Sequence, residues 1–290
     1  MIFYVIGNGF DRHYGLPTGY YDFKKFLLRN GYRELIKKVD NLFAERGYTT
    51  EEIEYWSEFE NMLTVFGQLY SDDIYNEAMD NAEQDDDRAD YWDSPAWNVD
   101  YYNQYIQVLK EQFDFWVKTM NVTITPDRYF RPQKGDCVLT FNYTPTIETN
   151  FDTTGVKIHH IHGTVGSEII LGHNYFGEPD YFTVIEDEDS DYRDVTCKKA
   201  VNNVIERAAA QYYKNSPAIL RRFHRIFESI KDYDKVVFMG LSCGEQDADY
   251  VQEILLRARS VDFFYRGETA RDNLKHCLGD IDVDVRYIRW

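Results

Sequence analysis

The first residues of the chain constrain its fold more than any other stretch. Ile2 to Ile6 is an uninterrupted apolar run of β-branched and aromatic residues, which predicts a strand buried on both faces. It leads directly into Gly7-Asn8-Gly9, where missing Cβ atoms let the backbone turn sharply and a ligand lie against its N–H groups. Phe10 to Tyr14 is predicted to begin a helix. A strand, a Gly-x-Gly turn and a helix start form a phosphate-binding corner, although a plain tight turn has the same pattern.

The net charge of the chain limits the partners that it can bind, and its cysteine content indicates its compartment. The 290 residues carry a formal net charge of −18, which argues against nucleic acid and against an anionic membrane surface. An anionic small ligand is compatible with this charge, because backbone N–H groups can bind it. No apolar run reaches membrane-spanning length, and the start has no signal-peptide pattern. The four cysteines are far apart without a C-x-x-C pair, so we expect reduced thiols in a cytoplasmic protein.

Strand-like and helix-like segments alternate along most of the chain. After a helical stretch at 24–128, strands are expected at 136–142, 156–161, 168–171, 235–241, 261–266 and 283–289. Helices are expected between several of them, at 196–213 and 217–230 among others. This order predicts an α/β, Rossmann-like fold, a mostly parallel sheet with helices on both faces. We expect one domain, 1–290, with 24–128 as a large helical insertion after the first strand.

In an open parallel sheet, ligands bind beyond the carboxyl ends of the strands. One polar segment expected there is Thr140–Thr144, in which the Asn142 amide can donate and accept hydrogen bonds or can cap the next helix. Another is 240–247, whose glycines and hydroxyl suit a close ribose or phosphate contact or an ordinary glycine-rich loop. Several such segments in one sheet predict a pocket.

A run of histidines ends a further expected strand. In His159-His160-Ile161-His162-Gly163, alternation places His160 and His162 on one face. Zinc would need a third ligand that is not evident, so no metal is expected. We interpret His162 as a general base, with Gly163 allowing close approach of substrate, and His159 and His160 as structural. Two acidic runs, 77–90 and 186–191, lack the spacing of a calcium loop and are interpreted as solvated surface.

These motifs together resemble a known family. The segments that carry the likeness are Gly7–Asp11, Gly15–Thr18 with Tyr21–Phe23, Trp56 with Phe59-Glu60, Thr140–Thr144 and His162-Gly163. In this order, over most of the chain, they are similar to the AbiH family of bacterial phage abortive-infection proteins. AbiH proteins resemble, more distantly, the sirtuin-like NAD-cleaving domains of antiphage defence.

The resemblance implies roles for individual residues. The Gly-x-Gly turn would bind the pyrophosphate of NAD, Asn142 and His162 would form the catalytic centre, and a Gly-x-Ser loop would touch the ribose. The residues expected to bind the nucleotide are Gly7, Asn8, Gly9, Tyr143, Gly163, Gly240, Ser242 and Asp247. Asp11 stands where sirtuins have a small hydroxyl residue, which leaves other nucleotides or nucleosides open as ligands. The zinc cysteines of sirtuins are missing, which disfavours a deacylase.

Two functions from different classes follow. The first is an NAD glycohydrolase, with NAD as substrate, in which Asn142 orients a water or ribose hydroxyl, His162 takes the proton and Asp11 stabilises the cationic sugar. The second is a nucleotide-binding sensor without turnover, which would use surface aromatics of the insertion at 91–97 to contact partners. A phage-derived trigger and a homo-oligomer are compatible with both. A nuclease is disfavoured by charge and by the lack of a metal-ligand cluster.

Overall fold

The computed structural model describes residues 1–45, 47, 59–63, 75–76, 79, 95–173, 182–187 and 190–290. They belong to two compact units. The first unit comprises 1–23, 114–170 and 214–290, and the second comprises 24–113 and 171–213. Trp56, the acidic run at 77–90 apart from Met79, and the aromatic residues Tyr91 and Trp92 lie outside the described residues, as does the side chain of Trp97.

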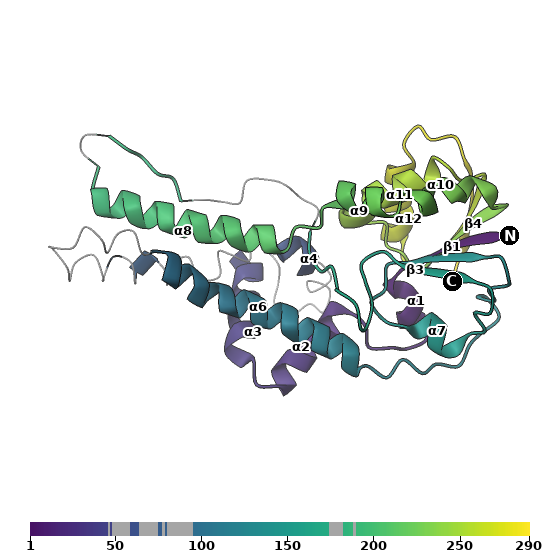
Figure 1. Ribbon diagram of the computed structural model, residues 1–290, viewed down its shortest axis with the longest axis horizontal. Helices are drawn as coiled ribbons and strands as arrows, with labels where there is room; N and C mark the ends of the chain where they lie inside the picture. The colour runs from purple at the N-terminus through teal and green to yellow at the C-terminus, as the bar shows by residue number, and fades with distance from the viewer. Residues whose placement is uncertain are drawn as a thin grey trace. The chain divides into compact units, whose positions relative to one another are not determined.

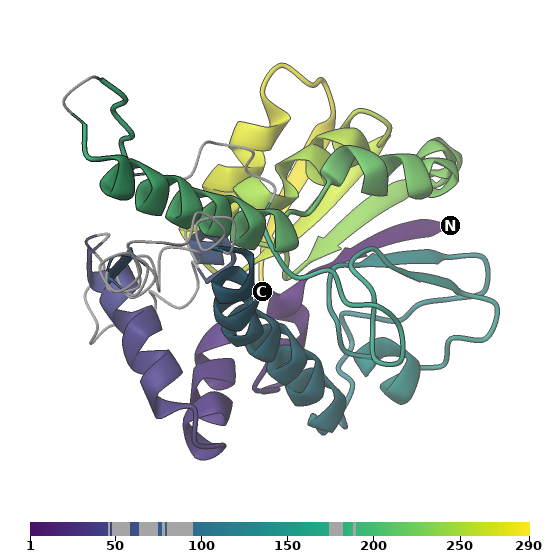
Figure 2. The ribbon, with the colours of Figure 1, turned by 60° about the vertical axis from the view of Figure 1, so that its left-hand side comes forward.

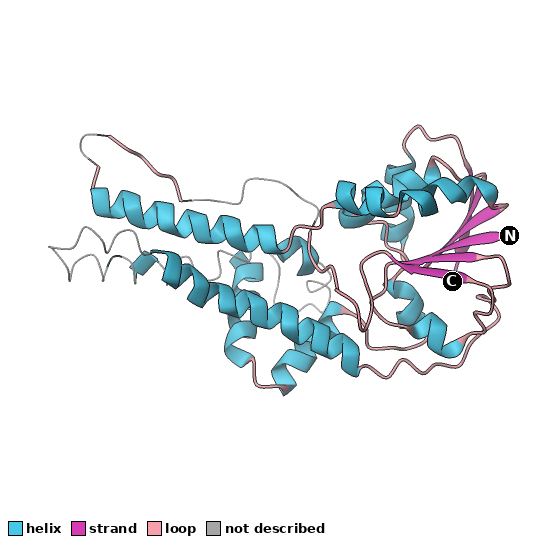
Figure 3. Ribbon diagram, in the orientation of Figure 1, coloured by secondary structure: helices cyan, strands magenta, loops and turns pink. Residues whose placement is uncertain are grey.

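The first unit contains a six-stranded sheet in the order β3-β2-β1-β4-β5-β6. Every neighbouring pair is parallel, and Figure 3 shows the strands as one fan. The strand bounds are β1 Ile2–Ile6, β2 Cys137–Thr140, β3 Lys157–His160, β4 Lys235–Met239, β5 Ser260–Tyr265 and β6 Asp284–Arg289. This order is that of Rossmann folds, so the predicted fold class is confirmed.

Alternating residues of each strand build a core on each face of the sheet. Phe3 and Val5 pack in one core cluster, and Tyr4 and Ile6 pack in another. The first face is covered by α9 (Ser216–Arg222), α10 (His224–Ser229), α11 (Ala248–Leu255) and α12 (Glu268–Leu278). The second face is covered by the short helices α1 (Asn8–His13) and α7 (Thr146–Asn150), as Figure 1 shows. Helices on both faces are therefore confirmed.

The second unit is helical where it is described. The helices that build it are α2 Tyr20–Arg29, α3 Arg33–Glu45, α4 Phe59–Met62, α6 Pro95–Thr119 and α8 Tyr192–Gln211, of which α2 begins and α6 ends in the first unit. Its buried apolar residues include Leu27, Val39, Phe43, Phe59, Leu109, Val201 and Ile205. Figure 2 shows α2, α3 and α6 in purple to blue and α8 in green. Among the described residues between β1 and β2 there is no strand, as the sequence predicts.

Two details differ from the sequence-based expectation. Residues 168–171 form no strand, because the Ile170 N–H donates to the His162 carbonyl (2.8 Å) within one loop and not to the sheet. The helix expected at 217–230 is divided into α9 and α10, with Phe223 between them. The second unit also takes in 171–213, so helices from two separate stretches of sequence build it. Whether 1–290 folds as one domain with an insertion stays a prediction.

Candidate functional site

The Gly-x-Gly turn after β1 packs against the loop after β4, backbone to backbone. The N–H of Gly7 donates to the Met239 carbonyl (3.0 Å), and the N–H of Gly9 donates to the Gly240 carbonyl (2.7 Å). A Cβ at Gly9 would lie 2.6 Å from the Gly240 oxygen. Gly240 itself has φ +69°, a conformation that favours glycine. The observed role of these glycines is therefore close packing of two loops, which uses two N–H groups of the turn.

Other residues expected to bind the nucleotide lie on the same two loops. The Asn8 side chain is exposed and donates from Nδ2 to the Thr18 carbonyl at 2.9 Å. Thr18 returns a hydrogen bond from Oγ1 to Asn8 Oδ1 at 2.5 Å. Ser242 is exposed, and its carbonyl accepts from Asn273 Nδ2 at 3.0 Å. Asp247 precedes α11 directly. These side chains come to one edge of the sheet from β1 and β4.

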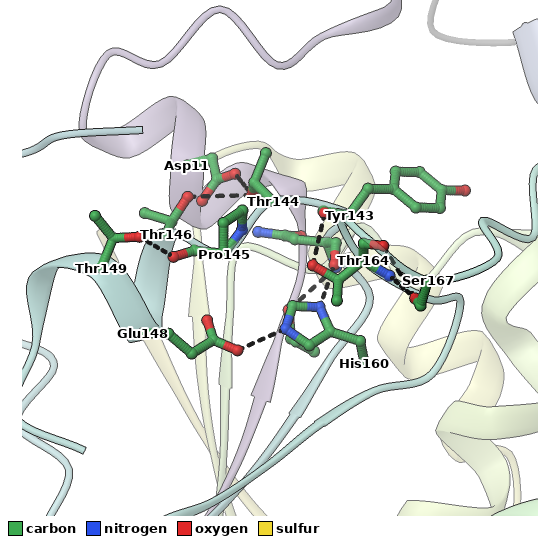
Figure 4. Close-up of polar contacts among 12 residues, drawn as sticks. Asp11, Tyr143, Thr144, Pro145, Thr146, Glu148, Thr149, His160, Thr164 and Ser167 are labelled. Atoms are coloured by element: carbon green, nitrogen blue, oxygen red, sulfur yellow. Dashed lines mark hydrogen bonds and ion pairs between the residues drawn. The ribbon is translucent and has the colours of Figure 1, made fainter. Parts of the chain in front are cut away.

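Asp11 is a fully buried carboxylic acid on α1, the helix that follows β1. Its Oδ2 accepts a short hydrogen bond from the Thr144 hydroxyl, and Thr146 Oγ1 lies 3.1 Å from Thr144 Oγ1 (Figure 4). Burial raises the pKa of Asp11 to about 6, although the polar side chains of Thr144, Thr146 and Asn142 oppose the shift. Asp11 Oδ1 is buried without a hydrogen-bond partner.

Asn142 lies just beyond the end of β2 and is 6% exposed. Its N–H donates to Thr140 Oγ1 at 3.1 Å, and its carbonyl accepts from His160 Nδ1 at 2.8 Å. The side-chain Oδ1 of Asn142 is buried and unpaired, like Asp11 Oδ1. The main chain of Asn142 is thus held on both sides, whereas its amide oxygen is left for another donor.

His162 lies beyond the end of β3 among aromatic rings. The ring centroids of Phe141 and Tyr250 are 5.4 and 5.6 Å from that of His162, and Tyr143 is at 6.4 Å. His162 Nε2 is buried and has no hydrogen-bond partner. Burial, and then the charge of Lys214, hold the pKa of His162 well below 6.5, so the imidazole is neutral at physiological pH. Gly163 has φ +83°, and a Cβ there would lie 1.9 Å from the Glu168 oxygen, so the turn requires glycine.

The other two histidines of the run differ from His162. His160 is hydrogen bonded at both ring nitrogens, because Nε2 lies 2.8 Å from Glu148 Oε1 while Nδ1 meets the Asn142 carbonyl (Figure 4). His159 Nε2 is buried without a partner, and burial lowers the pKa of His159. Sequence reasoning missed Glu148 and Thr146, and it named Thr144 within a strand-end segment without foreseeing its contact with Asp11. Glu148 is in the first turn of α7, and no local pattern indicates that it meets a histidine from β3.

The structure brings Asp11, Asn142 and His162 to the ends of three neighbouring strands, β1, β2 and β3. Gly240, Ser242 and Asp247 follow β4, on the other side of β1. Within the described ranges, no group of three or more His, Cys, Asp or Glu residues could hold a metal ion. No helix in that part of the chain is long and apolar enough to cross a bilayer.

Comparison with known proteins agrees with the sequence motifs. The family model described as "Bacteriophage abortive infection AbiH" matches residues 3–265, from β1 to the end of β5. The chain belongs to the AbiH family. Membership indicates a bacteriophage abortive-infection protein. The match includes the residues after β1, β2 and β3 (Asp11, Asn142 and His162) and those after β4 (Gly240, Ser242 and Asp247) of this AbiH chain. Searches of curated proteins and of solved structures found no match.

Proposed function

We propose that this AbiH protein is an NAD glycohydrolase that releases nicotinamide from NAD. The observation that carries the proposal is a set of three buried polar atoms without partners, namely Asp11 Oδ1, Asn142 Oδ1 and His162 Nε2. Buried polar groups are nearly always hydrogen bonded, and an unpaired one costs about 1–3 kcal/mol. Three such atoms after three neighbouring strands support a ligand site, because a ligand supplies the partners that the chain lacks.

The chemistry of the unpaired atoms supports a sugar as the group bound there. Two of them, on Asp11 and Asn142, are oxygens that accept hydrogen bonds. Ribose hydroxyls donate such bonds, whereas phosphate oxygens beside a carboxylate would be repelled. At the Gly7-Asn8-Gly9 turn, the N–H groups of Gly7 and Gly9 already donate to Met239 and Gly240, so neither is available to a phosphate. The nicotinamide ribose is therefore proposed to lie at the β1–β2–β3 ends.

The proposed reaction is attack of water on C1′ of that ribose. The bond between C1′ and the nicotinamide nitrogen breaks, and nicotinamide leaves with its electron pair. Asn142 orients the water, and the neutral His162 imidazole takes its proton at Nε2. Above pH 6 the Asp11 carboxylate is ionised and stabilises the oxocarbenium-like sugar at short range. The products are ADP-ribose, nicotinamide and a proton.

All three residues are buried, so substrate reaches them only after a covering segment moves. We propose that this segment is 163–170, which is hydrogen bonded to Tyr143 after β2 and to His162 after β3. Tyr143 OH donates to the Ile170 carbonyl (3.1 Å), and Thr164 Oγ1 donates to the Tyr143 carbonyl (3.0 Å). Ligand binding is expected to change hydrogen exchange in this segment.

The test is a direct assay. Purified protein is incubated with NAD, with and without phage lysate as trigger, and nicotinamide is measured by chromatography. We expect release from the native protein and none from Asn142→Ala or His162→Ala. Absence of nicotinamide under both conditions would reject the proposal.

The burial of the site supports a second candidate, a nucleotide-binding sensor without turnover. Because a ligand must displace a covering segment, binding and conformational change are coupled, which is how a sensor works. The discriminating result is simple. If Asn142→Ala and His162→Ala both retain nucleotide binding and protection of cells against phage, the sensor is correct and the hydrolase is not.

A further inference from the structure

His160 joins two segments of the first unit at the end of β3. Its Nδ1 lies 2.8 Å from the Asn142 carbonyl oxygen, and its Nε2 lies 2.8 Å from Glu148 Oε1. Its side chain is 10% exposed. Figure 4 shows the ring between the end of β3 and the first turn of α7, aimed at Glu148. One histidine thus links the strand-end loop of β2 to α7.

The hydrogen-bond pattern excludes His160 as the proton acceptor. A carbonyl oxygen only accepts, so Nδ1 must carry a proton. Nε2 faces the Glu148 carboxylate, so both ring nitrogens are engaged within the chain. The hydrogen bond from His160, together with that of a backbone group, leaves the pKa of Glu148 lowered although burial raises it, which keeps the carboxylate ionised. His160 therefore has no nitrogen free for substrate, unlike His162.

The contact is made to the main chain of the residue proposed to orient water. The N–H of Asn142 is already held by Thr140 Oγ1, so the bond from His160 holds the carbonyl side of the same residue. Fixing both sides of a loop residue restricts its rotation and hence the place of its side chain. A displacement of about 1 Å at a reacting group can cost about 100-fold in rate.

We propose that His160 is a positioning residue that holds Asn142 in its working conformation, with Glu148 orienting the His160 ring. The inference rests on the proposed function, because it takes Asn142 as the residue that orients the attacking water. A merely structural ion pair between β3 and α7 is the alternative. The two differ in which ring nitrogen matters: Nδ1 for positioning, Nε2 for the ion pair.

Two conservative variants separate these nitrogens. In His160→Asn the amide nitrogen stands near the place of Nδ1, so the hydrogen bond to the Asn142 carbonyl is kept and the contact with Glu148 is lost. In His160→Gln the amide nitrogen stands near the place of Nε2, so the reverse holds. We expect His160→Gln to lower kcat for nicotinamide release about 10- to 100-fold with KM nearly unchanged. We expect His160→Asn to stay within a few-fold of the native protein.

The matched control is His159→Asn, on the same strand and not in contact with Asn142, which should leave kcat unchanged. Glu148→Gln serves as a second variant in case His160→Gln does not fold. It retains an acceptor for Nε2 and is expected to lower kcat only a few-fold. Equal kcat for His160→Gln and the native protein would overturn the proposal, and so would a His160→Asn variant as slow as His160→Gln.

A second readout does not depend on turnover. Amide hydrogen exchange of 141–146 in the ligand-free protein should become faster in His160→Gln and stay native-like in His160→Asn. If the native protein releases no nicotinamide but this difference is found, the hydrolase fails and the positioning of Asn142 stands. If exchange is the same in all variants, the positioning is wrong, whatever the enzyme assay shows.

Discussion

Two groups of residues lie at the carboxyl edge of the sheet: a glycine cluster between β1 and β4, and a polar cluster beyond β1, β2 and β3. Their polar groups differ in whether they have hydrogen-bond partners within the chain. Between β1 and β4, glycine backbones touch, and the N–H groups of Gly7 and Gly9 find carbonyl partners within the chain. Beyond β1, β2 and β3, the side chains of Asp11, Asn142 and His162 each have a buried polar atom without a partner. Both clusters lie at strand ends, yet among their described side chains the buried polar atoms without a partner belong to the second.

This contrast distinguishes a sequence motif with a packing role from a candidate ligand site. The glycine motif is the more conspicuous in the sequence, but the structure accounts for Gly9 by its close approach to Gly240 alone. The polar cluster has no such structural explanation, because apolar residues of similar size would avoid the cost of unpaired polar atoms. Where folding alone does not explain a costly arrangement, function is the better explanation.

The largest effect is expected from a substitution in the glycine cluster, which tests its packing role. In Gly9→Ala the new Cβ would lie 2.6 Å from the oxygen and 2.8 Å from the Cα of Gly240, and both are main-chain atoms that cannot rotate away. We expect a loss of about 3 kcal/mol in the free energy of unfolding, measured by urea denaturation. The control is Gly19→Ala, where the nearest atom is a side-chain oxygen of Asp22 at 3.4 Å. A native-like Gly9→Ala protein would contradict the packing role.

Within the polar cluster, substitution of His162 is expected to lower the rate of NAD cleavage. His162→Gln retains a polar side chain but cannot accept a proton as imidazole does. We expect NAD cleavage to fall about 10²- to 10⁴-fold with little change in ligand affinity, measured by nicotinamide release and by calorimetric titration. His159→Gln is the matched control from the same strand. Retention of most of the activity in His162→Gln would remove the general-base assignment.

Asp11→Asn should make the protein more stable and less active. The pKa of Asp11 is raised from 3.8 to about 6, so ionisation costs the folded state about 3 kcal/mol at pH 8. Asparagine cannot ionise, so this cost is removed. The gain in the free energy of unfolding should be fully present above about pH 6 and should diminish as the pH falls from 6 to 3.8. Below pH 3.8 it should vanish. Thermal unfolding at pH 8 and pH 4 tests this, and lower stability of Asp11→Asn at pH 8 would refute it.

The smallest expected effect is the pH dependence that His162 imposes on stability. Its folded pKa is lowered well below 6.5, so the unfolded chain binds the proton more tightly and acid favours unfolding. The stability that the neutral His162 side chain contributes is fully present above about pH 7 and is lost as the pH falls below 6.5. Between pH 7 and pH 5 the native protein should lose more free energy of unfolding than His162→Gln does, with an upper limit of about 2 kcal/mol set by the ordinary histidine pKa. Equal losses of free energy of unfolding, measured by urea denaturation, would mean that folding does not lower the pKa of His162.

Much of the fold could be predicted from the sequence, because local patterns carry it. Continuous apolar runs of strand length mark β1 and β4, whose central residues are buried on both faces. Such strand-like runs alternate along the chain with segments of helical periodicity, which implies a parallel sheet. Where the pattern was short, at 168–171, the prediction of a strand was wrong, since glycines with positive φ at 163 and 166 set a loop there.

The candidate site could be predicted only in part. The positions of Asn142 and His162 at strand ends follow from the end of each apolar run. Their burial, and the raised and lowered pKa values of Asp11 and His162, depend on what packs over them. The contact between His160 and Glu148 joins residues of β3 and α7, and the grouping of 24–113 with 171–213 joins stretches far apart in sequence.

The sequence by itself therefore determined the six strands of the sheet, their parallel arrangement, the family and the loops on which polar residues stand. It could do so because hydrophobic periodicity and turn residues act over a few neighbouring positions. The tertiary structure alone decided which of those polar residues are satisfied. Hydrogen bonding and desolvation depend on atoms brought within about 3 Å of each other from distant parts of the chain. For this reason the Gly9 N–H meets a carbonyl from β4, while Asp11, Asn142 and His162 each retain an unpaired polar atom.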